Sequence, residues 1–139
     1  MKTAQYKFIA EQGWNFINGN DSINDGNLVL VFGSTANIKN ADNLNELKSK
    51  FTNAIFIGSS TSGEISDVNV FDDTDIATAI LFERTKIEYK SIEIADASNS
   101  YEAGSKLIEM LDKQDLTHVF VLSDGLRAYL IEGVGVQVV

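Results

Sequence analysis

The chain has 139 residues with 11 basic and 20 acidic side chains, a formal net charge of −9, and no proline or cysteine. Without cysteine, disulfides and thiolate metal sites are excluded. The acidity argues against nucleic acid and anionic membrane surfaces as partners, because both are bound through clustered Lys and Arg. With 44% hydrophobic and 22% charged residues, the composition is that of a globular protein, and the length suits a single domain over residues 1–139.

The N-terminal segment carries no secretory signal, because one basic residue, Lys2, is followed by no long apolar run. No stretch approaches the eighteen or so consecutive apolar residues of a membrane span. We therefore expect a soluble, cytoplasmic protein.

Three short apolar runs predict the centre of a sheet: residues 28–32 (LVLVF), 54–58 (AIFIG) and 119–122 (VFVL). Their length and β-branched content favour strands that are covered on both faces. At the N-terminus, residues 6–9 are a candidate edge strand, Trp14 is a candidate anchor on the sheet, and residues 18–27 have the composition of a loop.

Two segments have helical periodicity. Residues 40–51 place Leu44, Leu47 and Phe51 on one face, so together with the runs on either side they predict a βαβ unit. Residues 101–111 place Tyr101, Leu107, Ile108 and Leu111 on one stripe, after a start at Asn99 that resembles a capping box.

Residues 76–82 and 87–94 flank a four-residue polar segment, which predicts an antiparallel hairpin. The fold class expected is therefore α/β, with a mixed central sheet that contains a βαβ unit, an antiparallel hairpin and flanking helices. The apolar residues 133–139 predict a last strand that pairs with another segment, or a chain whose continuation would cover it.

Two polar clusters follow predicted strands, and the carboxyl ends of strands are where open α/β sheets bind ligands. Glycine lets the backbone approach a ligand, while Ser and Thr hydroxyls both donate and accept. The predicted ligand site consists of Ser60, Thr61, Ser62, Gly63, Glu64, Ser123, Asp124, Gly125 and Arg127. In it, Glu64 would recognise a cationic group such as an amino group, and Arg127 a carboxylate. The alternative for either cluster is ordinary turn chemistry.

Other motifs give weaker signals. The chain has no glycine-rich phosphate loop and no G-x-S-x-G nucleophile elbow, and His118 is the only imidazole. Residues 72–75 (DDTD) lack the glycine and the distant glutamate of a calcium loop, so we expect a solvated turn there rather than a metal site. Glu64 and Asp124 are a candidate acid–base pair whose separation the sequence does not fix.

At these clusters the sequence resembles the N-terminal part of FIST domains, over about residues 27–127. The resemblance is carried by residues 27–32 (NLVLVF), 57–65 (IGSSTSGEI), 79–82 (AILF) and 119–126 (VFVLSDGL). The family hallmark is a G-C-S-T-A-G-E-I-like stretch, in which Ser59 here replaces a common cysteine and Ser62 a common alanine. Family members continue with an N-G-[ST]-like stretch, a helix and a second FIST portion, so this chain is expected to be a shortened form.

The resemblance implies a non-catalytic sensory domain of prokaryotic-type signal transduction that binds a small polar ligand, such as an amino acid or its derivative, without a cofactor. Its implied partners are an output module or a second FIST portion. Two alternatives come from the residues: a hydrolase using Ser60 or Ser123 with a carboxylate, and an interaction module in which residues 133–139 pair with another chain, for instance a second copy.

Overall fold

The computed structural model describes residues 1–66, 68–72, 74–93, 98–122 and 135–138. The chain divides into two units, Met1–Glu83 and Arg84–Val139, and each is described here by itself. A division into units does not decide how many domains the chain forms, so the single domain over residues 1–139 stays a prediction. None of the helices in the described part of the chain is long and apolar enough to span a bilayer.

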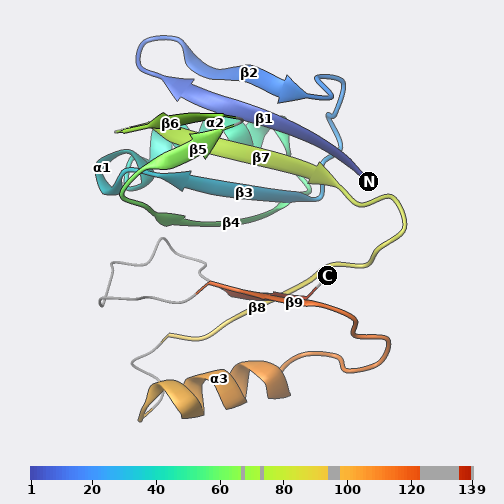
Figure 1. The fold of residues 1–139 in the computed structure, drawn as a ribbon. Coiled ribbons are helices and arrows are strands. Elements are labelled where there is room, and N and C mark those ends of the chain that lie inside the picture. Colours follow the sequence, from blue (N-terminus) through green and yellow to red (C-terminus); the bar gives the residue numbers. More distant parts are fainter. Residues whose placement is uncertain (67, 73, 94–97, 123–134, 139) are drawn as a thin grey trace. The chain divides into compact units, whose positions relative to one another are not determined.

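The first unit is built on a mixed sheet with the strand order β2-β1-β7-β3-β4 (Figure 1). Its elements in chain order are β1 (Lys2–Ile9), β2 (Gly13–Gly19), β3 (Leu28–Gly33), α1 (Thr35–Ile38), α2 (Ala41–Lys50), β4 (Ile55–Ser60), β5 (Glu64–Ser66), β6 (Asn69–Phe71) and β7 (Asp75–Leu81). β3 and β4 are parallel, whereas β7 is antiparallel to both β1 and β3. The predicted α/β class and mixed sheet are confirmed.

The predicted βαβ unit is confirmed as β3, α2 and β4. Helix α2 begins where the Asn40 side chain accepts a hydrogen bond from the Asp42 backbone N–H, at 3.1 Å, which satisfies a donor that the helix itself leaves free. Its apolar stripe buries Leu44 and Leu47. Short helix α1, inserted before α2, was not predicted.

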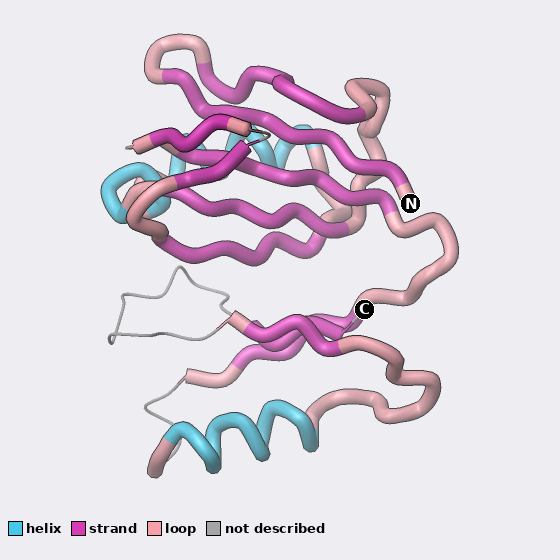
Figure 2. Tube along the Cα trace, viewed as in Figure 1, coloured by secondary structure: helices cyan, strands magenta, loops and turns pink. Residues whose placement is uncertain are grey.

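The two faces of the sheet are covered by different elements, as the tube in Figure 2 also shows. On β1, where side chains alternate between faces, Tyr6 makes an edge-to-face contact with Phe51 at the end of α2. Gln5 points the other way and accepts a hydrogen bond from Ser66 in β5. The helices therefore cover one face, and the β5–β6 hairpin lies over part of the other.

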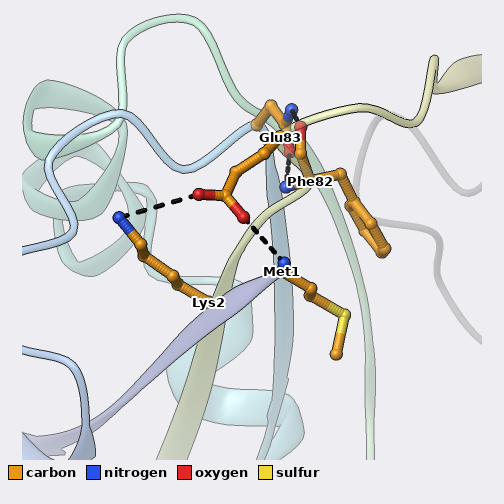
Figure 3. A network of polar contacts seen from close by, with 5 residues as sticks. Met1, Lys2, Phe82 and Glu83 are labelled. Carbon is orange, nitrogen blue, oxygen red and sulfur yellow. Dashed lines mark hydrogen bonds and ion pairs between the residues drawn. The ribbon is translucent and has the colours of Figure 1, made fainter.

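Polar contacts close the edge of the sheet where β7 ends. The Asn27 side chain donates to the Phe82 carbonyl and accepts from the Phe82 backbone N–H, each at 3.0 Å. Figure 3 shows the neighbouring ion pairs, in which Glu83 binds the Met1 ammonium at 2.9 Å and the Lys2 ammonium at 3.8 Å. The Met1 ammonium lowers the pKa of Glu83, mainly by donating a hydrogen bond to it and secondly by its positive charge.

The N-terminal segment differs from its prediction. β1 is an interior strand between β2 and β7, and β2 extends to Gly19, so the edge strand and the loop start predicted there are wrong. Trp14 is an anchor, as expected: its indole N–H donates to the Asn43 carbonyl at 2.7 Å and thereby joins β2 to α2.

The hairpin predicted from residues 76–82 and 87–94 is wrong. β7 pairs with β1 on one side and β3 on the other along its whole length, so no edge is left for residues 87–94. Those residues supply β8 (Glu88–Ser91) in the second unit, where β8 pairs with β10. The polar segment between the two runs lies at the boundary between the units.

The second unit contains β8, α3 (Ser100–Glu109), β9 (Val119–Val121) and β10 (Gly135–Val138), with the strand order β8-β10-β9. The prediction that residues 119–122 form a central strand covered on both faces is therefore wrong. β9 is an edge strand of this sheet, and its Val121 is 55% exposed. Helix α3 is confirmed, with Asn99 capping the Glu102 N–H at 2.9 Å, although Tyr101 and Ile108 of its predicted apolar stripe are exposed. The predicted last strand is β10, which pairs on both sides within the chain.

Candidate functional site

One edge of the five-stranded sheet brings three strand ends together. Gly33 at the end of β3 lies opposite Ser60 at the end of β4 and opposite Asp75 at the start of β7. Because β7 runs antiparallel to the other two, its first residue meets their last residues. This is the carboxyl edge of β3 and β4, where the sequence predicted the ligand site.

The closest packing at this edge is between Gly33 and the Asp75 side chain. A Cβ at this position would overlap the carboxyl group of Asp75, so only glycine admits that side chain beside the backbone. The Gly33 carbonyl accepts a hydrogen bond from the Thr61 backbone N–H at 2.9 Å, and the Ser34 N–H donates to the Thr74 carbonyl at 3.2 Å. These bonds fix the loops that leave β3 and β4 against the start of β7.

Glu64 enters the same edge from the hairpin layer. It begins β5 and is only 3% exposed. The Thr61 hydroxyl donates to one of its carboxylate oxygens, Oε1, at 2.6 Å. The other oxygen, Oε2, is buried and has no hydrogen-bond partner among the described residues. A buried acceptor left without a partner is costly, so it marks a position that a donor would stabilise.

Asp75 is the second buried carboxylate, with 1% of its surface exposed. Burial, and in smaller part the negative charge of Glu64, raise the pKa of Asp75 to about 6, although hydrogen bonds from Asn37 and Asn43 act in the opposite direction. Its Oδ1 atom is also buried and without a partner in the described part of the chain. The solvated turn predicted for residues 72–75 is therefore wrong at its end, because Thr74 and Asp75 are both buried.

The structure brings together part of the predicted site. Ser60 is half-buried at the end of β4, Thr61 and Ser62 are exposed in the following loop, and Gly63 precedes the buried Glu64. The other predicted site residues lie outside the described residues: Ser123, Asp124, Gly125 and Arg127. The expected meeting of the two loops, and the pair of Glu64 with Asp124, lie outside them too and stay predictions.

Four residues at this edge were missed in the sequence: Gly33, Asn37, Asn43 and Asp75. Gly33 ends a buried apolar run and Asp75 begins another, which is a signal for polar groups at a strand end. This signal does not by itself place Asp75 beside Gly33, because the sequence does not show that β7 pairs with β3. Asn37 and Asn43 lie on helices, and nothing in their spacing relates them to Asp75.

A hollow of about 550 Å³ lies within the second unit. It is lined by residues of both charges and by uncharged ones: Arg84, Thr85, Lys86, Glu88, Asp112, Gln114, Asp115, Leu116 and Thr117. Its acidic side chains are already engaged in part, since Glu88 binds the Lys90 ammonium at 2.9 Å. No cluster of three or more His, Cys, Asp or Glu suited to a metal ion occurs in the described residues.

The fold and the site define an acidic α/β module whose polar centre lies at the carboxyl edge of a mixed sheet. The chain belongs to the FIST N domain family, whose model matches residues 27–138. FIST domains form a family of sensory modules in signal transduction. No curated protein and no solved structure matches the chain.

Proposed function

We propose that this chain is a non-catalytic input module that binds a small polar ligand with an amino group, such as an amino acid or a derivative, at the carboxyl edge of β3 and β4. The observation that carries the proposal is the buried Glu64 carboxylate: one oxygen accepts from Thr61, and the other has no partner among the residues that the structure describes. A ligand N–H group supplies the missing donor, and the bond to a carboxylate is stronger than one between neutral groups.

The surroundings suit recognition rather than catalysis. The Thr61 hydroxyl donates to Glu64, and Ser60 lies opposite Gly33 at the same edge of the sheet. A serine nucleophile would need an adjacent base, and the only imidazole of the chain, His118, is an exposed residue of the second unit. The sequence prediction for the segment outside the described residues is kept as part of the proposal: Ser123 and Asp124 close the other side of the ligand, and Arg127 binds its carboxylate.

The ligand signal would pass to an output module or to a second FIST portion. The other partner proposal is association of two copies through residues 133–139, and it would require strand pairing to be broken. β10 is paired with β8 and β9 within the chain, so another chain would have to displace one of those strands.

Calorimetry with a panel of amino acids tests the binding proposal. We expect one or a few members of the panel to bind, and Glu64→Gln to weaken that binding about tenfold or more, because a charge-assisted hydrogen bond to a buried group contributes roughly 1.5–3 kcal/mol. The matched control is Asp25→Asn, which removes the same charge from an exposed loop and should leave the affinity unchanged. Absence of heat with every member, for folded protein, would contradict the proposal.

A further inference from the structure

The hollow in the second unit lies between two segments of the chain. One segment, within residues 84–88, leads into β8, and the other, within residues 112–117, belongs to the loop between α3 and β9. A hydrogen bond joins them, since the Asp112 backbone N–H donates to the Glu88 carboxylate at 3.2 Å. The volume of about 550 Å³ lies within the range of sites that hold small organic ligands.

The first of these segments supplies two cationic side chains to the hollow, Arg84 and Lys86. Neither forms an ion pair within the described residues. Both are exposed, so water screens their mutual repulsion and their N–H donors stay available. An anion placed beside both would be stabilised by two opposite charges.

The acidic side chains of the hollow are engaged in part by other groups. Glu88 binds the Lys90 ammonium at 2.9 Å, and the hydrogen bond from Lys90, followed by the one from the Asp112 N–H, lowers the pKa of Glu88. Asp112 accepts from the Gln114 backbone N–H at 3.0 Å, which is a turn within its own loop. The two cations are thus left without a direct carboxylate partner in the described part of the chain.

We infer that Arg84 and Lys86 bind the carboxylate of a small organic acid, whose body occupies the rest of the hollow beside Leu116. This site is separate from the one proposed at Glu64 and does not depend on it. The Arg84 guanidinium is a planar fork of N–H donors that matches a carboxylate, and Lys86 adds a point charge. Leu116 is half-buried, packs against Leu111, and supplies apolar surface to the hollow.

The other carboxylates of the hollow restrict the ligand to a single negative charge. Asp112 and Asp115 line the same hollow as the two cations. A doubly charged anion, such as sulfate or a phosphate monoester, is repelled by both of them more strongly than a monocarboxylate is. The hollow therefore selects against a dianion by like charge as well as for a carboxylate by opposite charge.

Backbone amide chemical-shift mapping on the full chain tests the site, with sodium butyrate as the probe and butyramide as its uncharged match. At constant ionic strength we expect butyrate to shift signals within residues 84–88 and 112–117, and butyramide at equal concentration to leave them unchanged. Sodium sulfate should bind about threefold more weakly than butyrate, or weaker still, because Asp112 and Asp115 repel it. In a second series, added sodium chloride should lower the butyrate affinity, since salt screens exposed charges.

Three variants locate the binding. Arg84→Gln should weaken butyrate binding about threefold or more, as the loss of an exposed charged contact. The matched control is Lys113→Gln, because Lys113 is an exposed cation of the same loop that does not line the hollow; we expect it to leave the butyrate affinity nearly unchanged. Asp115→Asn introduces a residue that tolerates the left-handed φ of 63° at this position, and it should narrow the difference between sulfate and butyrate.

Three results would overturn the inference: no butyrate shifts within residues 84–88 and 112–117 of the folded protein, equal shifts with butyramide, or equal losses of affinity in Arg84→Gln and Lys113→Gln. Sulfate binding as tight as that of butyrate, with no effect of Asp115→Asn, would overturn the restriction to one negative charge.

Glu64→Gln separates this site from the proposed function. We expect butyrate binding to persist in that variant while amino-acid binding weakens. Loss of butyrate binding in Glu64→Gln would assign butyrate to the sheet edge and remove the inference. Butyrate binding at the hollow, with no amino acid bound by the wild type, would support the inference and contradict the proposed function.

Discussion

Ionisation of Asp75 makes the free energy of unfolding of the protein depend on pH. Its pKa in the folded protein is about 6, above the ordinary value of 3.8, so the folded state holds the proton more tightly than the unfolded state does. A carboxyl group with a raised pKa contributes stability that is fully present below its unfolded pKa and is lost as the pH rises through its folded pKa. The free energy of unfolding should therefore fall between about pH 4 and pH 6 through this group.

Asp75→Asn removes that loss, because an amide of the same shape carries no charge to bury. We expect the free energy of unfolding of the variant, relative to that of the wild type, to be about 2 kcal/mol higher at pH 7 than at pH 4. Urea denaturation of both proteins at several pH values measures the difference, in which contributions from other carboxyl groups cancel. A difference that does not change with pH would show that Asp75 is not buried as a carboxylate.

Gly33 is the second residue on which the site depends. Gly33→Ala places a methyl group against the Asp75 carboxyl, and we expect a loss of roughly 1–3 kcal/mol, as for other overpacked positions. The control is Gly104→Ala in α3, where an added Cβ meets nothing within 4 Å, and which should stabilise by roughly 0.5–1 kcal/mol. Equal effects of the two substitutions in thermal denaturation would contradict the close packing at Gly33.

At the scale of elements, Trp14 connects the edge strand β2 to helix α2. Its indole N–H donates to the Asn43 carbonyl, and its ring makes an edge-to-face contact with Phe8. Trp14→Phe keeps an aromatic ring and removes the donor, so we expect a loss of about 1 kcal/mol. Because Asn43 also acts on Asp75, the midpoint of the Asp75 titration should shift as well. No change in either quantity would show that the two elements are not connected through Asn43.

The elements that the sequence predicts well are those with strong local signals. β3, α2 and β4 follow from two apolar runs and one periodic segment between them, and the short loops leave few alternative arrangements. β7 also has a clear apolar run, but its partners do not follow from it. Pairing with β1 and β3 is a long-range choice made by packing on both faces, and a nearby polar segment gave a false hairpin signal at residues 83–86.

The candidate site was predictable only as far as it is local. The loop from Ser60 to Glu64 follows a buried strand in sequence, so its position at the carboxyl edge could be predicted. Asp75 reaches the same edge because an antiparallel strand begins there, which no spacing shows. The acidic composition of residues 72–75 favoured a solvated turn, and burial at the sheet edge overrides that preference for the last two residues of the segment.

On the scale of the whole chain, the first unit contains two buried carboxylates, Glu64 and Asp75, and the second contains an open hollow of about 550 Å³. The two places differ in kind. The hollow is lined by groups of both signs, whereas Glu64 and Asp75 each have a buried oxygen atom without a partner in the described part of the chain. We expect the ligand to be recognised by Glu64, because satisfying a buried acceptor yields more than replacing water at an open surface.

The most direct test of the proposed ligand site is a backbone amide chemical-shift map of the full chain, recorded while the amino-acid panel is added. We expect a binding member to shift the signals of Gly33, Thr61, Glu64 and Asp75, and Glu64→Gln to abolish those changes. Shifts confined to residues 84–117, or no shifts at any residue of the folded protein, would contradict the assignment of the ligand site to the carboxyl edge of β3 and β4.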